Sequence, residues 1–176
     1  WFPRKDTFPN GLRPVADAVH DMGMGLIIWF EPERVHEGTW IDREHPEWVL
    51  KIPSNRNGLL DLGNSVALDW LINHISDMID REGIDVYRND FNIGPLPFWR
   101  ATDSDDRQGI TEIRYIEGLY QFWDALLERH PGLLIDNCAS GGRRIDLELI
   151  SRSLALWRTD YSFEASGQQS HTYGLH

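Results

Sequence analysis

The sequence predicts an α/β fold of the (β/α)8 barrel class, with this chain covering about half of the barrel. Short apolar runs alternate with longer stretches whose apolar residues recur at helical spacing, a pattern typical of parallel sheets with crossover helices. Long polar loops follow the strands, whereas the returns from helix to strand are short, as in barrels whose functional loops lie at the C-terminal strand ends. A full barrel takes about 250 residues, so we interpret the 176 residues as an internal part of a single barrel domain. The alternative is a small doubly wound α/β domain that is complete in itself.

The predicted elements can be placed in order along the chain. The helices have apolar side chains every three or four residues and cover residues 12–22, 68–79, 113–127 and 146–152. The strands are short apolar runs, buried on both faces, at residues 24–30, 84–90, 132–137 and 154–160. Gly23 ends the first helix, because glycine readily takes the left-handed conformation of a helix C-terminus. A long polar and aromatic loop is predicted between residues 31 and 63.

Composition and charge exclude several classes of function. The formal net charge of −11 argues against a nucleic-acid partner, which requires a basic surface. No apolar run approaches the roughly 20 residues of a membrane span, so no membrane partner is expected. Cys138 is the only cysteine, which excludes an intrachain disulfide and leaves the compartment undetermined. The sequence has no phosphate loop, no calcium loop and no histidine pair at zinc-ligand spacing, and we therefore expect neither a cofactor nor a metal.

Two aspartates, Asp90 and Asp160, each close a predicted strand. A carboxylate at the C-terminal end of a barrel strand faces the site where such folds do chemistry. Glycoside hydrolysis needs two carboxylates on one pocket, one to attack and one to donate a proton. Each residue also has a structural interpretation, because Asp90 could be a helix N-cap and Asp160 a loop residue paired with Arg158. Arg88 lies on the same side of its strand as Asp90, so its charge is expected to keep Asp90 ionised.

Five segments resemble the motifs of one enzyme family, in the family's order. These segments are residues 8–12, 29–33, 88–92, 138–146 and 157–160. The third is similar to a Lys-Trp-Asp-x-Asn motif that holds a nucleophile, the fourth to a glycine-rich loop that begins with Cys, and the fifth to a Trp-x-Ser-Asp segment that holds an acid/base. The family is that of the family 36 glycoside hydrolases, the microbial α-galactosidases.

The resemblance implies a retaining α-galactosidase whose barrel strands three to six are contained in this chain. It makes Asp90 the nucleophile and Asp160 the acid/base, and it implies an α-galactoside oligosaccharide or glycoconjugate as substrate. Further sugar-contacting positions implied by the motifs are Trp29, Arg88, Cys138 and Gly141. The family usually has Lys where this chain has Arg88, and that departure leaves the details of hydroxyl recognition open. Trp29 could equally be a core residue.

Two alternatives stay open beside this hypothesis. Ser140 and Arg143 stand in place of two glycines of the family loop, and their side chains could fill the space at the sugar 2-position or reach an acetamide, as in an α-N-acetylgalactosaminidase. The matches at Cys138 and Gly141 favour the galactoside. The second alternative is a non-catalytic fragment that retains only part of the sugar site. The family's pair of Asp residues for the 4- and 6-hydroxyls has no counterpart here, so the isolated chain is expected to be nearly inactive. Open sheet edges favour association, and the full-length protein could be a homo-oligomer.

The barrel interpretation also predicts a geometry. Trp29, Asp90, Cys138 and Asp160 should line one concavity at the C-terminal ends of the strands. Arg88 should lie within charge-pairing reach of Asp90. The two carboxyl groups should approach the separation of roughly 5–5.5 Å that retaining enzymes use.

Overall fold

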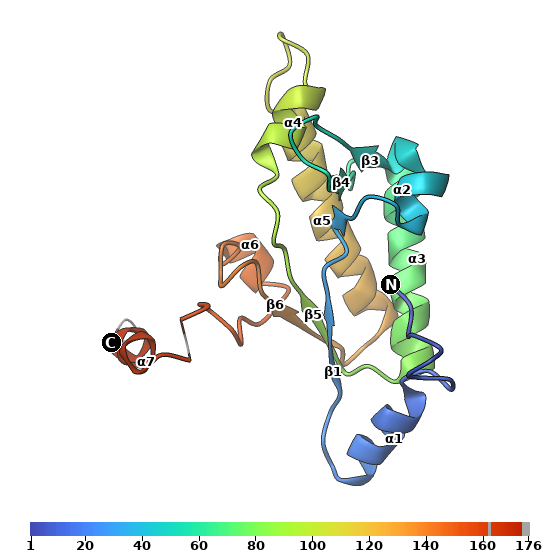
Figure 1. The fold of residues 1–176 in the computed structure, drawn as a ribbon. Coiled ribbons are helices and arrows are strands. Elements are labelled where there is room, and N and C mark those ends of the chain that lie inside the picture. Colours follow the sequence, from blue (N-terminus) through green and yellow to red (C-terminus); the bar gives the residue numbers. More distant parts are fainter. Residues whose placement is uncertain (162, 174–176) are drawn as a thin grey trace.

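A parallel sheet of three strands forms the centre of the computed structural model, which describes residues 1–161 and 163–173 (Figure 1). The strands are β1 (Ile27–Phe30), β5 (Val86–Asn89) and β6 (Leu134–Asn137), in the order β1-β5-β6. Their register is level, since Phe30 pairs with Asn89 and Asn89 with Asn137. The residues that follow the three strands therefore meet at one edge of the sheet.

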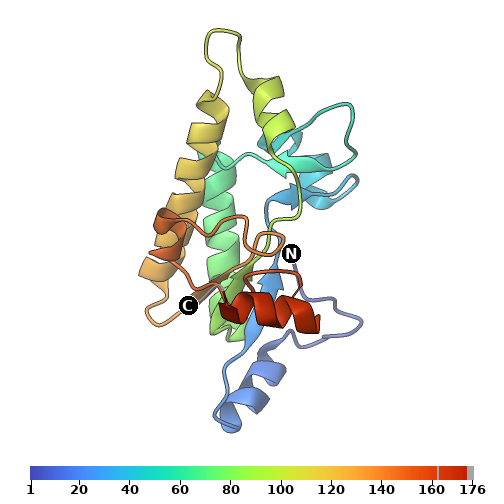
Figure 2. The same ribbon diagram turned by 90° about the vertical axis from the view of Figure 1, so that its left-hand side faces the viewer.

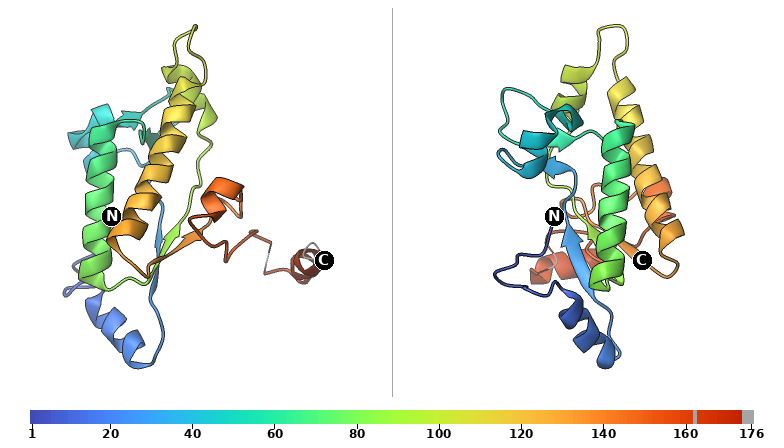
Figure 3. Two further views of the ribbon diagram at one scale, coloured as in Figure 1. Left: turned by 180° about the vertical axis from the view of Figure 1, so that it is seen from behind. Right: turned by 90° about the vertical axis from the view of Figure 1, so that its right-hand side faces the viewer.

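Two long helices cover one face of this sheet. The helices α3 (Ser65–Glu82) and α5 (Ile110–Arg129) pack side by side against it, and their buried apolar residues form the core with the strands (Figures 2 and 3). The side chains of Ile27, Trp29 and Leu134 point to the opposite face and are about half exposed. A doubly wound domain would cover both faces, so the described residues do not fit that alternative and form a partial α/β domain.

The helices begin and end where the sequence predicts, to within a few residues. Asn64 accepts hydrogen bonds from the backbone amides of Val66 and Ala67 at the start of α3, and Gly83 takes a left-handed conformation at its end, with φ of 72°. The first helix, α1 (Arg13–Asp21), lies below the sheet in Figure 1 and ends just before Gly23. Local capping chemistry thus marks both ends of α3 and the end of α1.

The loop after β1 contains more structure than the sequence indicates. A second sheet, antiparallel and ordered β2-β4-β3, forms within it. The elements of this loop are β2 (Arg34–Val35), α2 (Trp40–Glu44), η1 (Pro46–Trp48), β3 (Val49–Leu50) and β4 (Gly58–Leu60). Strands of two or three residues are too short to give a periodic sequence signal. The helices α4 (Leu96–Thr102) and α7 (Ala165–Tyr173) were also not predicted, and α7 stands apart from the sheet.

The fourth predicted strand, at residues 154–160, is wrong for most of its length. After the short helix α6 (Leu147–Ile150), only Leu154 joins the sheet, through a single parallel bridge to Asp136. Two residues later, the backbone amide of Leu156 donates to the side-chain carboxylate of Asp136 at 3.0 Å and not to a backbone carbonyl of β6. The backbone pairing with β6 therefore stops there. Leu154 and Leu156 are exposed rather than buried. Asp160 consequently lies in a turn and not at the end of a strand.

Candidate active site

Asp90 directly follows β5 and is held by three neighbouring segments. The Trp29 indole nitrogen donates to Asp90 Oδ2 at 3.0 Å, and the backbone amides of Phe91 and Ser140 donate to Oδ1 at 2.7 and 3.2 Å. The residue is 9% exposed. No helix begins at Asp90, since α4 starts at Leu96, so the N-cap interpretation of this residue is wrong.

These contacts determine the charge state of Asp90. Burial raises the pKa of this carboxyl, but hydrogen bonds outweigh burial and hold the pKa below its usual value. The donors are the side chains of Asn92 and Trp29 and the backbone amides of Ser140 and Phe91. Asp90 is therefore ionised at neutral pH, as an attacking carboxylate must be.

Trp29 lies on the open face of the sheet and not in the core. Its side chain is 51% exposed and lines a cleft of about 520 Å³ beside the C-terminal end of β1. Much of the lining is aromatic, with contributions from Trp1, Phe2, Trp40 and Trp70. Flat aromatic surfaces of this kind suit the apolar faces of sugars.

Arg88 does not pair with Asp90, which corrects the expectation from strand spacing. Its guanidinium forms an ion pair with the buried carboxylate of Asp136. Asp136 is the residue directly opposite Arg88 on the neighbouring strand, about 4.8 Å away across the ladder, whereas Asp90 lies two residues farther along the same strand, about 6.6 Å. The cross-strand carboxylate is nearer, and the ion pair lies on the same face as Trp29.

The loop from Cys138 to Arg144 connects Asp90 with Asp160. Cys138 is buried, and burial together with the negative charge of Asp90 raises the pKa of its thiol. Ser140 donates its amide to Asp90, and the next residue, Gly141, contacts Asp160. A Cβ atom on Gly141 would lie 2.7 Å from the backbone nitrogen of Asp160 and 3.1 Å from its Cγ, so a side chain does not fit here.

Asp160 is exposed and accepts a hydrogen bond from the Trp157 indole at 3.1 Å. In the part of the chain that the structure describes, Asp160 forms no ion pair with Arg158. Asp90 and Asp160 therefore contact consecutive residues of one loop, Ser140 and Gly141. Of the four residues predicted to line one concavity, only Trp29 lines the 520 Å³ cleft. Trp29 and Cys138 each approach Asp90 as well, by the indole hydrogen bond and by the position of the thiol.

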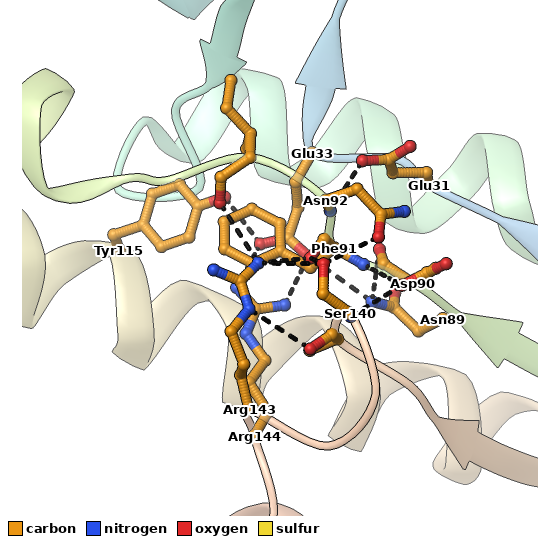
Figure 4. Close-up of polar contacts among 12 residues, drawn as sticks. Glu31, Glu33, Asn89, Asp90, Phe91, Asn92, Tyr115, Ser140, Arg143 and Arg144 are labelled. Carbon is orange, nitrogen blue, oxygen red and sulfur yellow. Dashed lines mark hydrogen bonds and ion pairs between the residues drawn. The ribbon is translucent and has the colours of Figure 1, made fainter. Parts of the chain in front are cut away.

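A buried polar network beneath Asp90 was not assigned from the sequence. Glu33 forms a bidentate ion pair with Arg144 and accepts a hydrogen bond from the Tyr115 hydroxyl (Figure 4). Glu31 accepts the backbone amide of Asn92 at 2.8 Å. Both glutamates lie in the 29–33 motif, and Arg144 lies in the 138–146 motif. The sequence signal that could have identified this network is the presence of charged residues directly after predicted buried strands.

The described residues contain neither a metal-binding cluster nor a membrane-spanning helix. No group of three or more His, Cys, Asp or Glu side chains is arranged there to hold a metal ion. None of the helices in the described part of the chain combines the length and the apolar character needed to cross a bilayer.

Comparison with known proteins gives a consistent result. Residues 1–167 match the family model described as Melibiase. The chain is 30% identical over 166 residues to the α-galactosidase Mel36A of Lactobacillus acidophilus, covering 91% of this chain and 23% of that protein. It is 31% identical over 170 residues to an Escherichia coli α-galactosidase, with the same coverage of 91% and 23%.

Solved structures agree with the sequence matches. The α-galactosidase of Lactobacillus brevis superposes with a TM-score of 0.88 at 29% identity, over 99% of this chain and 24% of that one. The α-galactosidase AgaA of Geobacillus stearothermophilus, in complex with stachyose, gives a TM-score of 0.87 at 27% identity, over 99% and 25%. The chain thus spans about a quarter of the length of the relatives it matches.

Proposed function

Since the chain belongs to the Melibiase family, we propose that the complete protein is a retaining glycoside hydrolase that removes terminal α-galactosyl groups. This chain would supply three strands of its (β/α)8 barrel, β1, β5 and β6, with Leu154 at the place of the next strand, and both catalytic carboxylates. The observation that carries the proposal is that Asp90 and Asp160 contact neighbouring residues of one loop. Asp90 accepts the amide of Ser140, and Asp160 lies against Gly141. The substrate is an α-galactoside oligosaccharide or glycoconjugate, in keeping with the stachyose bound to the Geobacillus relative.

The proposed reaction has two steps. An oxygen of the ionised Asp90 attacks the anomeric carbon while Asp160 gives its proton to the glycosidic oxygen, so that the bond to the leaving group breaks as a galactosyl ester forms. Asp160 then takes a proton from water, whose oxygen attacks the same carbon and releases Asp90. The lowered pKa of Asp90 supports its role as nucleophile. The exposure of Asp160 leaves it accessible to both the leaving group and water.

The remaining sequence-predicted residues are proposed to hold the sugar. Trp29 offers its ring on the open face and fixes Asp90 with its indole nitrogen. Arg88, partly exposed and anchored by Asp136, is placed to donate to sugar hydroxyls. Cys138 and Gly141 belong to the loop between the two carboxylates, where a sugar ring attacked by Asp90 would be bound.

The positions of Ser140 and Arg143 favour a galactoside over an N-acetylgalactosaminide. Ser140 Oγ donates to the Phe91 carbonyl at 3.1 Å and to Asn92 Oδ1 at 2.8 Å. The Arg143 guanidinium donates to the carbonyls of Phe91 and Ile93 at 2.6 and 3.3 Å. Both side chains thus contact the segment after β5, which supports the galactoside.

The non-catalytic alternative applies to the chain in isolation. Apolar residues of the sheet that α3 and α5 do not cover, among them Ile27, Leu134 and Leu154, are about half exposed. A barrel would bury them in its interior. We expect the isolated 176 residues to be nearly inactive, and robust turnover by a verified monomer would contradict this.

The decisive experiment uses the complete barrel, with nitrophenyl α-galactoside and its 2-acetamido analogue as substrates. The galactoside should be the better substrate, and proton NMR should detect α-galactose as the first-formed product. Asp90→Ala should lower turnover on the order of 10⁴-fold. Asp160→Ala should impair poor leaving groups more than nitrophenolate, which needs little protonation. Initial release of β-galactose, or near-normal turnover by Asp90→Ala, would refute the proposal.

A further inference from the structure

We propose that the buried Glu33–Arg144 ion pair is a positioning device, which fixes the Cys138–Arg144 loop over the end of β5 so that the Ser140 amide and the Cys138 thiol meet Asp90. This inference rests on the proposed catalytic role of Asp90. Neither Glu33 nor Arg144 touches Asp90 directly, and their effect is exerted through the loop and through Asn89 and Phe91, which precede and follow Asp90.

The ion pair joins three parts of the chain at one buried point. Arg144 Nη1 lies 2.7 Å from Glu33 Oε1 and Nη2 lies 2.6 Å from Oε2, and the Tyr115 hydroxyl donates to Oε2 at 2.6 Å. Glu33 is 0% exposed and Arg144 is 8% exposed. Glu33 follows β1, Tyr115 belongs to α5 and Arg144 ends the loop after β6. The ion pair therefore fixes the loop relative to two elements of the core.

The guanidinium of Arg144 also lies directly below the catalytic strand end. Its central carbon is 3.8 Å from the centre of the Phe91 ring, and Phe91 is the residue after Asp90 (Figure 4). Burial lowers the pKa of Arg144, but the Glu33 carboxylate outweighs it, so the guanidinium stays charged. Stacking of a charged guanidinium on an aromatic ring is favourable. A shift of Arg144 would thus displace Phe91 and the loop together.

The loop needs such an attachment because its backbone is unfavourable. Ser140, Gly141 and Gly142 have φ angles of 49°, 75° and 101°, three consecutive residues in the left-handed region. For Ser140, which has a Cβ atom, this conformation is unfavourable. Strained segments persist only where surrounding contacts hold them. Asn137 adds one such contact, since its side-chain amide donates to the Arg144 carbonyl at 2.7 Å.

A purely stabilising role is the competing explanation, and the energetics of buried ion pairs make it the weaker one. The cost of removing two charges from water offsets most of their attraction, so such a pair adds little net stability compared with apolar residues. Its bidentate geometry does, however, define one orientation of the loop. The two explanations differ in what happens at Asp90 and Cys138 when the pair is altered.

The test compares Arg144→Lys and Glu33→Gln with a matched control, Glu82→Gln, all in the complete barrel. Glu82 is another buried glutamate with an arginine neighbour, Arg81, but it lies at the opposite edge of the sheet. All three variants should have a lower melting temperature. Only Arg144→Lys and Glu33→Gln should lower kcat, about tenfold or more with little change in KM, because the nucleophile is misplaced.

Two further readouts report the loop without requiring turnover. The first is the rate at which Cys138 reacts with iodoacetamide, mapped by mass spectrometry. The second is the pKa of the Asp90 carboxyl, followed by carbon-13 NMR. Loss of the Ser140 hydrogen bond should raise that pKa and move the acid limb of kcat/KM to higher pH, because the bond favours the ionised form. Cys138 alkylation should accelerate about tenfold, since loop opening exposes the thiol.

The outcomes separate the possibilities. If the Arg144 and Glu33 variants lose thermal stability like the Glu82 variant, and alkylation and the Asp90 pKa stay at wild-type values, the positioning role is refuted. If Arg144→Lys does not fold, the double variant Glu33→Met/Arg144→Met removes both charges and is measured in the same way. Altered loop readouts with no α-galactosidase activity in the wild type would refute the proposed function and leave the positioning role intact.

Discussion

The two edges of the parallel sheet are alike in several respects, and yet only one has the features of an active site. Each edge has a buried carboxylate, Asp90 at the C-terminal strand ends and Glu82 at the N-terminal ones, and a cleft, of about 520 Å³ and about 490 Å³ respectively. At the N-terminal edge, Asp85 accepts the backbone amide of Leu26 at 2.7 Å and contacts the His20 ring at 2.7 Å. Those contacts tie α1 and β1 to β5.

At the C-terminal edge, the carboxylates hold loops rather than regular elements. Glu33 binds the loop after β6, and Asp90 binds the same loop and accepts a hydrogen bond from the indole of Trp29, which lines the aromatic cleft. The cleft at the other edge has no Trp, Tyr or Phe in its lining. Cavity size and carboxylate burial therefore do not identify the site. The direction of the strands, which gathers the longer loops at one edge, does.

The sharpest test of this comparison replaces one carboxylate at each edge of the sheet by an amide. Asp90→Asn should lower turnover of the complete barrel on the order of 10⁴-fold with little change in stability, because an amide cannot serve as the nucleophile. Asp85→Asn should lower the free energy of unfolding by about 1 kcal/mol, through weaker bonds to Leu26 and His20, and leave kcat unchanged. Urea unfolding and steady-state kinetics measure both. Equal catalytic losses in the two variants would show that the edges do not divide function in this way.

Two glycines provide the next comparison, between core and site. In Gly118→Ala, the new Cβ of α5 would clash with the Leu62 carbonyl oxygen. Overpacking against buried backbone should lower the free energy of unfolding by about 3 kcal/mol. Gly141→Ala should cost less stability, about 1–2 kcal/mol of left-handed strain. Its Cβ would displace Asp160, however, and a displacement of about 1 Å at a catalytic group should lower kcat about 100-fold. Thermal melting and kcat should therefore rank the two variants in opposite orders.

The lowered pKa of Asp90 stabilises the fold at pH values above the pKa that this group has in the unfolded chain. This contribution is lost as the pH falls through the folded-state pKa.

The acid limb of the pH–rate profile should respond to Trp29. Trp29→Phe removes one donor to the ionised Asp90, so the pKa of Asp90 should rise and the acid limb of kcat/KM should move to higher pH. Trp40→Phe, in the same cleft but without a hydrogen bond to Asp90, is the control. An unmoved acid limb in Trp29→Phe would mean that the indole does not tune Asp90.

The smallest effect is expected from Ser140→Gly. Glycine relieves the left-handed strain at this position but loses the bonds to Phe91 and Asn92, and the two changes should offset to within about 1 kcal/mol. The ratio of rates on the galactoside and its 2-acetamido analogue should stay within about threefold of wild type, because Ser140 Oγ contacts Phe91 and Asn92 and is not among the proposed sugar contacts. A large change in that ratio would mean that the Ser140 side chain contacts the sugar.

Local patterns in the chain were sufficient for the elements that carry Asp90. The apolar runs before Phe30, Asn89 and Asn137 predict three parallel strands, and the caps at Asn64 and Gly83 bound the long helix between the first two. These features follow from side-chain periodicity and from capping, which involve residues a few positions apart. The role proposed for Asp90 came instead from the resemblance of residues 88–92 to a family motif.

The partners of the charged residues required the folded structure. Arg88 pairs with Asp136 and not with Asp90, because strand register brings Asp136 nearer, and Glu33 finds Arg144 across 111 residues of sequence. The predicted strand at residues 154–160 fails because an apolar run becomes a strand only where a neighbour accepts its hydrogen bonds, and Asp136 takes the amide of Leu156 instead. Periodicity and capping act between neighbours in sequence, whereas ion pairs and sheet edges depend on residues that only the fold brings together.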